Sequence, residues 1–419
     1  MFPRPVLPPT SLPQPGFAGV VTARFASVAQ VALASIFIVL SACGGSPRAP
    51  RAGGPGSPDK PDVGNPFWNV RYYINPDYVQ KVEAAAAKAS PTDAALIRKV
   101  EAYPTAIWLD SIAKAATIGK YLDDAKQQQL KTGQPPLTVF VVYDLPNRDC
   151  SARASAGELK VEEDGETRYK KEFIDPIAAQ FRAHSDQPIV VILEPDSLAN
   201  LATNLGNPRC AKSQDAYLLS EAYAIQTLAL PNVSIYLDAA HAGWLGWDGN
   251  RGRIVEIFKR VMTLAGGYDK VRGFATNVSN FNTLNGRDGK KMEPSDPCPD
   301  EISYVHHLGD TLARHGVKHK RFIIDTARNG KGRLRRHWGN WCNIKGAGLG
   351  ERPGVTDESA VDAYFWIKPP GESDGVADPK APRYDANCSS GDSAPGAPQA
   401  GEWFDSYFVE LVRNAQPPL

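Results

Sequence analysis

Short apolar segments that end abruptly in polar residues recur along the chain, and they restrict its fold more than any other feature. There are seven of them, at residues 106–110, 137–144, 189–196, 233–238, 271–277, 322–328 and 363–368. Each is almost continuously apolar, which is typical of strands buried on both faces of a parallel sheet. Helical stretches lie between them, including residues 81–100, 172–182, 213–230 and 253–264. The pattern predicts an α/β fold, a barrel related to the (β/α)8 type with about seven parallel strands.

The first 43 residues differ from the rest and predict export. Residues 25–40 (FASVAQVALASIFIVL) carry no charge. This run is shorter than the roughly 20 residues of a membrane span and suits the core of a signal peptide. It ends in Leu40-Ser-Ala-Cys43-Gly44, which resembles a bacterial lipobox, where the cysteine thiol receives a lipid. We predict a lipoprotein signal peptide over residues 1–43 with lipidation at Cys43. An ordinary signal peptide and an uncleaved anchor are the alternatives.

Residues 44–64 are rich in Gly, Pro and Ser and cannot contribute to a core, so they are predicted to form a linker. A single folded domain is expected over residues 65–419. We expect an exported protein that is lipid-anchored at the bacterial cell envelope or surface, and otherwise secreted. In this interpretation the protein meets a membrane only through the lipid on Cys43.

The remaining cysteines of an exported chain are free to form disulfides. They are five in number, so two bridges and one unpaired thiol are expected, at Cys150, Cys210, Cys298, Cys342 and Cys388. Their positions alone do not select the pairs. No CxxC or His-rich spacing occurs, so we predict no metal site.

Polar and acidic residues lie where each predicted strand ends. In parallel barrels these carboxyl ends lie on one face and carry the chemistry. A single such residue is usually a helix cap or part of a loop ion pair. A ring of carboxylates at all seven ends is costly unless some are protonated or paired, and it is the arrangement that acid–base hydrolysis requires. The residues are Asp110, Asp144 with Asp149, Glu194 with Asp196, Asp238 with His241, Asn277 with Asn280, Asp325 with Arg328, and Lys368 with Asp374.

Tryptophans accompany these polar strand ends, in segments rich in Gly and Asn, at Trp108, Trp244, Trp247, Trp338 and Trp341. Trp366, in contrast, lies inside an apolar run, as a core residue would. Flat aromatic rings beside carboxylates suit a pyranose, because the C–H face of the sugar stacks on the ring while its hydroxyls bond the acids. This favours a polysaccharide as the substrate class, although a core role for Trp108 or Trp338 stays open.

The charge balance argues against a nucleic-acid partner. The chain has 47 Lys and Arg residues against 46 Asp and Glu residues, a formal net charge of +1. Proteins that bind polyanions normally carry a clear excess of basic residues.

Six long motifs occur in order along the chain. They are 142–150 (VYDLPNRDC), 193–200 (LEPDSLAN), 236–247 (YLDAAHAGWLGW), 275–280 (ATNVSN), 338–343 (WGNWCN) and 368–375 (KPPGESDG). Together they resemble glycoside hydrolase family 6, the inverting cellobiohydrolases and endoglucanases. The resemblance covers residues 65–419, which would be one catalytic domain. It implies a distorted barrel of seven parallel strands.

The resemblance also implies catalytic roles at matching positions. Asp196 matches the general acid that protonates the leaving oxygen. Asp149 matches the neighbour that raises the pKa of the acid and helps to hold the water. Asp374 matches the residue usually proposed as base, although water can relay that proton. Tyr143 matches a tyrosine that contacts the distorted sugar in such enzymes. Arg148 and Ser155 match residues of the loop that positions the water.

Further positions match sugar-binding residues of the family. The polar ones are Asp238, His241, Asn280, Lys368 and Glu372, and we add Asp110 at the end of the first strand. The stacking platforms match Trp108, Trp244, Trp247 and Trp341. The same alignment pairs Cys150 with Cys210 and Cys342 with Cys388, which leaves Cys298 unpaired.

The expected function is inverting hydrolysis of β-1,4-glucosidic bonds in cellulose or related glucans by a monomer without a cofactor. The stretch 374–399 is long and resembles the loop that roofs a tunnel in exo-acting members, so we favour release of cellobiose from chain ends. The alternative within the family is an open-cleft endoglucanase. A surface lipoprotein that binds glucan without cutting it is a third interpretation. It is disfavoured because the motifs around Asp149 and Asp196 are intact.

Overall fold

The computed structural model describes residues 64–286 and 295–419. The predicted signal peptide, Cys43 and the linker up to residue 63 lie outside the described residues. Within the described ranges, no helix is both long and apolar enough to cross a membrane.

The sheet contains the seven predicted strands, and all of its pairs are parallel, which confirms the predicted fold class. The order β2-β3-β4-β5-β6-β7-β8 follows the sequence, and the two-residue strand β1 pairs with the start of β3. The strands are β1 (Arg71–Tyr72), β2 (Ile107–Leu109), β3 (Pro136–Val142), β4 (Ile189–Leu193), β5 (Val233–Asp238), β6 (Gly273–Thr276), β7 (Arg321–Asp325) and β8 (Val361–Phe365).

The sheet curls into a barrel whose interior is filled by alternate residues of each strand. Val139 and Val141 of β3 pack inside with Tyr236 of β5, whereas Phe140 and Val142 pack outside, under the helices. The first and last strands close the barrel incompletely. At this seam the Ala106 N–H donates to the Trp366 carbonyl (3.1 Å), and the Trp108 indole N–H donates to the Ile367 carbonyl (2.8 Å). This seam distorts the barrel.

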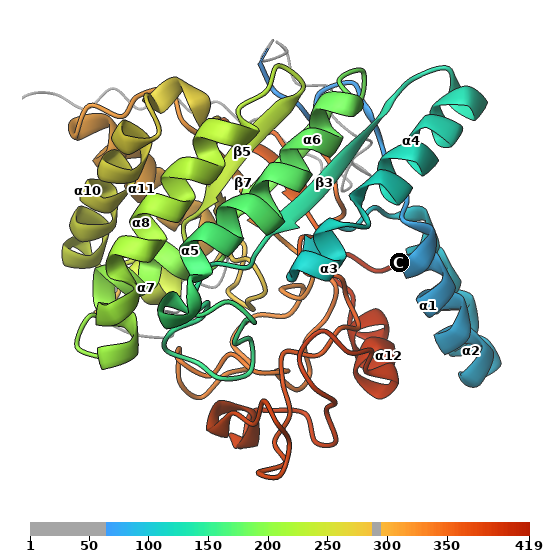
Figure 1. Cartoon of the computed structure of the whole chain (residues 1–419). Helices are drawn as coiled ribbons and strands as arrows, with labels where there is room; N and C mark the ends of the chain where they lie inside the picture. Colours follow the sequence, from blue (N-terminus) through green and yellow to red (C-terminus); the bar gives the residue numbers. More distant parts are fainter. Residues whose placement is uncertain (1–63, 287–294) are drawn as a thin grey trace, which may run out of the picture. The chain divides into compact units, whose positions relative to one another are not determined.

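Helices cover the outside of the barrel, and α4, α6, α8, α10 and α11 run along its outer face (Figure 1). Figure 1 also shows the loops that follow β3, β7 and β8 gathered on one side, where the strands end. The helices are α1 (Pro76–Lys88), α2 (Pro91–Lys99), α3 (Ile112–Ala115), α4 (Ile118–Thr132), α5 (Gly165–Arg168), α6 (Asp175–Ala183), α7 (Ser197–Thr203), α8 (Pro208–Leu228), α9 (Ala242–Leu245), α10 (Asp248–Leu264), α11 (Glu301–Arg314) and α12 (Asp405–Arg413).

Two predicted helices differ from the observed ones for local reasons. The helix predicted over residues 81–100 is two helices, because Pro91 lacks an N–H and holds Ser90 extended, and the Ser90 hydroxyl then caps α2. The helix predicted from residue 172 starts earlier, with the π-helical turn η3 (Tyr169–Ile174) that leads into α6.

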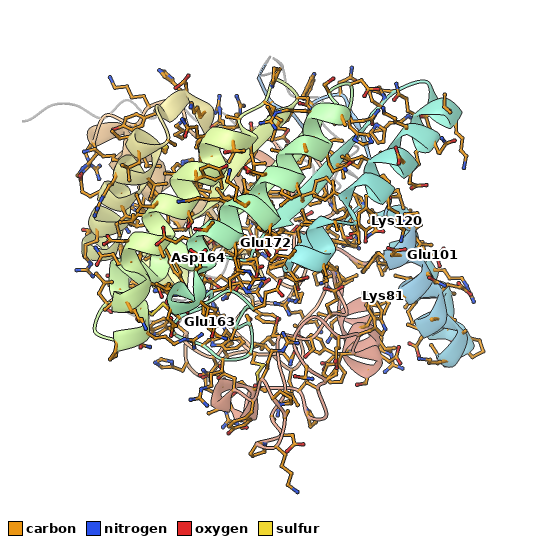
Figure 2. All side chains as sticks on the ribbon, in the orientation of Figure 1. Lys81, Glu101, Lys120, Glu163, Asp164 and Glu172 are labelled. Atoms are coloured by element: carbon orange, nitrogen blue, oxygen red, sulfur yellow. A yellow bond between two sulfur atoms is a disulfide. The ribbon has the colours of Figure 1, made fainter. Side chains whose placement is uncertain are left out.

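A separate cluster of buried side chains joins α1, α2 and α12 to the loops after β7 and β8. Ion pairs reinforce this side of the molecule. Lys120 of α4 pairs with Asp77 of α1 (2.7 Å), and Lys81 of α1 pairs with Glu372 in the loop after β8 (2.9 Å). Figure 2 labels both lysines among the side chains of these helices. The loop after β8 is therefore anchored to the outer helices.

Candidate active site

A pocket of about 320 Å³ opens where the barrel strands end. Trp108 of β2 and the segments that follow the other six barrel strands, β3 to β8, contribute to its lining. The residues are Trp108, Tyr143, Asp149, Ser151, Ala152, Ser155, Pro195, Asp196, Asn204, His241, Trp244, Val278, Ser279, Asn280, Trp338, Gly339, Trp341, Lys368, Asp374 and Ala400. Eleven of the sixteen predicted catalytic and sugar-binding residues are in this lining. The remaining five, Asp110, Arg148, Asp238, Trp247 and Glu372, lie beside or beneath it.

Asp196 follows β4 on a turn that exposes its carboxyl to the pocket. Its backbone is left-handed (φ +66°), as is that of Glu194 (φ +48°), and this geometry ends the strand at Leu193. Asp196 occupies the cap position of α7 but makes no side-chain cap hydrogen bond, so its carboxyl is not used by the helix. The Asp196 N–H donates to Asp238 Oδ2 (2.9 Å). Burial raises the pKa of Asp196 well above its usual value, and the charges of Asp238 and Asp149 raise it further.

Asp149 lies on the loop after β3, also with a left-handed backbone (φ +52°). Burial raises its pKa to about 6. Asp385 adds to this increase, while the Arg148 charge and a hydrogen bond with Ser155 oppose it. Asp149 precedes Cys150, whose disulfide with Cys210 ties this part of the loop to α8. The pocket thus contains two neighbouring carboxyls that hold protons more strongly than free aspartates.

Arg148 is buried and fixes the loop after β3. It donates to three backbone carbonyls, those of Asp110 (2.8 Å), Tyr143 (2.5 Å) and Ser155 (2.8 Å). Its guanidinium also lies 4.4 Å from the centre of the Tyr143 ring. Arg148 therefore connects the ends of β2 and β3 to the loop that carries Asp149.

Asp374 lines the pocket from the loop after β8, far along the chain from the loops after β3 and β4. Both of its carboxylate oxygens accept from the fully buried Arg328 (2.8 Å each), and Oδ2 also accepts the Asn343 N–H (2.8 Å). Arg328 is held in turn by the Ser279 carbonyl and by the Phe281 ring, 4.2 Å from its guanidinium. Asp374 is thus part of a rigid ion pair between the loops after β6, β7 and β8.

Two aromatic rings and a lysine form another part of the pocket lining. Trp108 stands edge-on to Tyr143, with ring centres 5.6 Å apart, and the Lys368 ammonium lies 5.5 Å from the Trp108 ring centre. Burial lowers the pKa of Lys368, and the carboxylates of Asp374 and Glu372 oppose that decrease. The indole at Trp108 is therefore a pocket wall rather than a core residue.

His241 belongs to a hydrogen-bond network that sequence reasoning did not identify. Its Nδ1 bonds the Asn282 amide (2.8 Å), and that amide also donates to Glu301 (3.0 Å). Arg335 bonds Asn282, and it also bonds Asn280 (3.0 Å). Burial lowers the pKa of His241 well below its usual value, with a smaller contribution from the Arg335 charge. The imidazole is therefore neutral at ordinary pH.

The five predicted residues outside the lining have identifiable partners. Asp238 lies under Asp196 and accepts two backbone N–H groups, Glu372 pairs with Lys81, and Asp110 pairs with Lys114 (2.7 Å). The Trp247 ring contacts the Trp338 ring, with centres 5.8 Å apart, so it extends the aromatic wall beyond the pocket. Trp338, whose role the sequence left open, lines the pocket, as do the unpredicted Ser151, Asn204 and Ser279.

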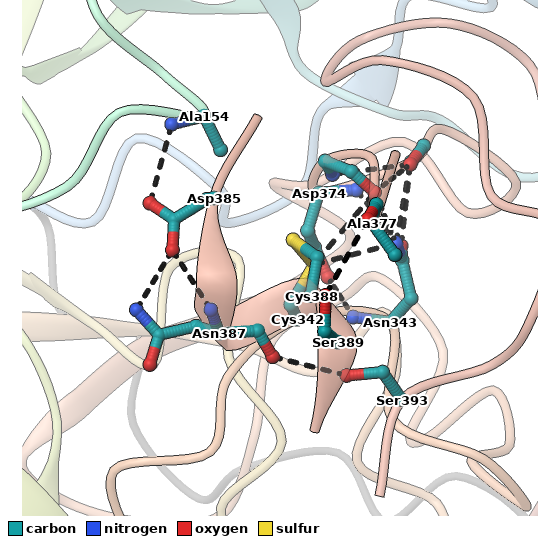
Figure 3. Close-up of a disulfide and its surroundings, with 12 residues drawn as sticks. Ala154, Cys342, Asn343, Asp374, Ala377, Asp385, Asn387, Cys388, Ser389 and Ser393 are labelled. Atoms are coloured by element: carbon teal, nitrogen blue, oxygen red, sulfur yellow. Dashed lines mark hydrogen bonds between the residues drawn. A yellow bond between two sulfur atoms is a disulfide. The ribbon is translucent and has the colours of Figure 1, made fainter. Parts of the chain in front are cut away.

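The two disulfides are those that the resemblance implied, Cys150–Cys210 and Cys342–Cys388, and Cys298 is free and buried. Figure 3 shows the second bridge beside Asp374 and Asn343, with Asp385 bonded to the backbone of Ala154 nearby. Disulfides of this kind belong to proteins that fold outside the reducing cytosol, in agreement with the expected export. In the described part of the chain, no group of three or more His, Cys, Asp or Glu residues is arranged to hold a metal ion.

A parallel barrel whose pocket combines buried, proton-holding carboxyls with a wall of indole rings defines a glycoside hydrolase that acts on a polysaccharide. Comparison with known proteins identifies the family. The model of the glycosyl hydrolases family 6 matches residues 67–415, so the chain belongs to this family.

The relatives that this chain matches include fungal exoglucanases and cellobiohydrolases. Exoglucanase 3 of Agaricus bisporus is 42% identical over 358 residues, which cover 85% of this chain and 80% of that protein. The 1,4-beta-D-glucan cellobiohydrolase C of Emericella nidulans is 42% identical over 370 residues, covering 84% and 79%. Among solved structures, cellobiohydrolase II (Cel6A) of Humicola insolens, in complex with glucose and cellotetraose, is 38% identical with a TM-score of 0.82, covering 85% and 100%.

Proposed function

We propose that this chain is an inverting cellobiohydrolase, with Asp196 as the general acid for β-1,4-glucan. The observation that carries the proposal is the position of Asp196: it lies in an indole-walled pocket beside two further carboxyls, and its pKa is raised by burial, by Asp238 and by Asp149. A carboxyl that keeps its proton near neutral pH can give it to the leaving glycosidic oxygen. The relatives, which are named exoglucanases and cellobiohydrolases, support β-1,4-glucan as the substrate.

The water would be held on the other face of the sugar ring. Asp149 and Ser155 line the pocket on the loop after β3, and Asp374 lines it on the loop after β8. In an inverting enzyme the water attacks directly, so one of these carboxyls takes its proton, either by contact or through a second water. Asp374 is the proposed base. Its pairing with Arg328 leaves a relay through water as the alternative route.

The glucan chain would lie along the aromatic wall. Trp108, Trp244 and Trp341 line the pocket, and Trp247 extends it. Sugar C–H faces stack on such rings, while His241, Asn280 and Lys368 offer polar groups to the hydroxyls. The proposal takes the enzyme as a monomer.

Stereochemistry is the first test of this proposal. A single displacement on a β-linkage delivers the α-anomer at each new reducing end. Proton NMR of a fresh cellotetraose digest should show the α-anomeric signal growing ahead of the β-anomeric signal. A β-signal that rises first would exclude direct water attack.

Contacts between two loops support exo action. Asp385 Oδ2, in the loop after β8, accepts the N–H groups of Arg153 (2.8 Å) and Ala154 (3.4 Å), in the loop after β3. The loops approach so closely that a Cβ at Gly375 would lie 2.8 Å from the Ala154 Cβ. Both loops also line the pocket. A roof of this kind keeps a chain threaded and favours release of cellobiose from an end.

Breaking this loop contact should shift the enzyme toward internal cleavage. In Asp385→Ala the loop after β3 loses this contact with the loop after β8, so internal segments of a glucan gain access to the pocket. We expect the viscosity of carboxymethyl cellulose to fall several-fold more per reducing end released than with the wild type. Asp378→Ala is the matched control, because Asp378 is exposed on the same loop and bonds only within it. If both variants behave like the wild type, the loop contact does not set the mode of action.

The lipid anchor rests on the sequence Leu40-Ser-Ala-Cys43-Gly44 alone, outside the described residues. In the proposed form, residues 1–42 are removed, Cys43 becomes the first residue and carries lipid, and residues 44–64 connect it to the catalytic domain at the cell envelope. Cys43→Ser should therefore move the enzyme from the membrane fraction to the soluble fraction. A wild-type enzyme that is already soluble after export contradicts the anchor and leaves a secreted enzyme.

A further inference from the structure

Glu221 is a buried carboxyl directly beneath the turn that presents Asp196. It lies on α8, and 1% of its surface is exposed. Its Oε1 contacts the hydroxyl of Ser197, the residue that follows Asp196. Its Oε2 has no hydrogen-bond partner among the described residues. None of the ion pairs in the described chain includes Glu221. A charged carboxylate in this position would be buried with neither a cation nor a full set of donors.

The Ser197 hydroxyl has one proton for two contacts, and this limits the protonation state of Glu221. The hydroxyl oxygen lies 2.6 Å from the Glu194 carbonyl oxygen and also contacts Glu221 Oε1. A carbonyl oxygen can only accept, and a serine has a single O–H to donate. If Ser197 donates to Glu194, the proton in the other contact must come from Glu221. The hydrogen bonds then run in one direction, from the Glu221 O–H to Ser197 and from Ser197 to the Glu194 carbonyl.

These bonds hold a strained piece of backbone. Glu194 and Asp196 are both left-handed, on either side of Pro195, a conformation that non-glycine residues adopt only when their surroundings hold them. The Glu194 side chain anchors one end of the turn by accepting from the Asp144 N–H (3.2 Å) and the Tyr169 hydroxyl (2.8 Å). Ser197 anchors the other end, where α7 begins. Among the described residues, Glu221 is the only side chain that bonds the Ser197 hydroxyl.

We propose that Glu221 is a positioning residue that works as a neutral acid: its O–H holds Ser197, and through Ser197 the turn that aims the Asp196 carboxyl at the substrate. The inference rests on the proposed role of Asp196. It adds a residue that touches no substrate, in a part of α8 outside the motifs of the sequence.

The surroundings of Glu221 favour the neutral form. The titratable groups that face it are Glu194 at the end of β4, Asp238 of β5 and Tyr169 of η3. All three are acids. Burial raises the pKa of Glu221 well above its usual value, and the charges of Glu194 and Asp238 raise it further. A Ser197 hydroxyl that donated to Glu221 instead would oppose this increase only in part.

The first experiment tests protonation without using activity. An unfolded glutamate has a pKa of about 4.3, so a Glu221 that stays protonated in the folded enzyme binds one more proton than the unfolded chain above that pH. Stability is then lost as pH rises toward the folded pKa. Between pH 5 and 7 the unfolding equilibrium constant of the wild type should rise about tenfold per pH unit relative to Glu221→Gln. Urea unfolding at several pH values measures this ratio, and a ratio that is constant with pH overturns the proposal.

Glu194→Gln is the matched control, because Glu194 is equally buried but only accepts hydrogen bonds from the Asp144 N–H, the Leu145 N–H and Tyr169. Burial raises the pKa of Glu194 to about 7, so the comparison is made at pH 8, where Glu194 is ionised. An amide NH₂ there would face a donor, so this variant should be less stable than the wild type at pH 8. At Glu221 the glutamine NH₂ replaces the carboxyl O–H, and no loss at pH 8 is expected. Equal losses at pH 8 in the two variants would contradict a donating Glu221.

The second experiment tests positioning. Glu221→Gln should hydrolyse cellotetraose within about twofold of the wild-type kcat, whereas Glu221→Leu should lose about tenfold, the equivalent of one hydrogen bond. The Leu variant should lose much less on 2,4-dinitrophenyl β-cellobioside, whose leaving group needs no proton. Equal losses on both substrates would make Glu221 a purely structural residue. If Asp196→Ala also shows equal losses, the acid assignment itself fails, and the pH dependence of Glu221→Gln stability still decides the protonation.

Discussion

Asp196→Ala should reduce the kcat for cellotetraose by about 10³-fold, within the range that a general acid contributes. The loss follows from the proton that the Asp196 carboxyl retains and that a sugar leaving group requires. A 2,4-dinitrophenolate departs without a proton, so hydrolysis of 2,4-dinitrophenyl β-cellobioside should fall by no more than about tenfold. Steady-state kinetics on the two substrates measure the difference.

Asp196→Asn is the control for this result. It keeps the shape of the side chain and the backbone hydrogen bond to Asp238, but it has no acidic proton. It should behave like the Ala variant on both substrates. Equal losses on cellotetraose and on the activated substrate would assign the proton transfer to another residue.

Arg328→Met should lower the free energy of unfolding by about 3–5 kcal/mol, the usual cost of leaving one member of a buried ion pair. The Arg328 side chain is fully buried and bonds both oxygens of Asp374. Without it, the Asp374 carboxylate keeps the Asn343 N–H as its partner in a site with little access to water. Urea unfolding followed by tryptophan fluorescence measures the change.

A double variant separates the charge from the packing. In Arg328→Met/Asp374→Asn no unpaired charge remains, so the double variant should recover a large part of the lost stability. It should not recover activity on cellotetraose if Asp374 is the base. Recovery of both would mean that Asp374 serves only the fold.

The seven strands were predictable because strands buried on both faces leave a continuous apolar record in the sequence. Their ends were less predictable. The segment 189–196 reads as one strand, yet β4 stops at Leu193 because Glu194 and Asp196 adopt left-handed backbones. Likewise, the break between α1 and α2 depends on one Ser-Pro pair within an otherwise helical pattern.

The carboxyls of the site were predictable from topology, since parallel strands place their ends on one face. Their partners were not. Arg328 reaches Asp374, which is 46 residues away, and Glu221 reaches Ser197 from a helix with no recognisable motif. Contacts of this kind depend on how loops fold over the barrel, and no periodicity records them. The disulfide pairs also required the family resemblance, because five cysteines allow several pairings.

Neither disulfide joins two strands of the barrel. Cys150 lies next to Asp149, and Cys342 precedes Asn343, which bonds Asp374, so each bridge holds a loop that carries a carboxyl of the pocket. Reducing both bridges would therefore release the covalent ties of two pocket loops and leave every strand pair of the barrel in place.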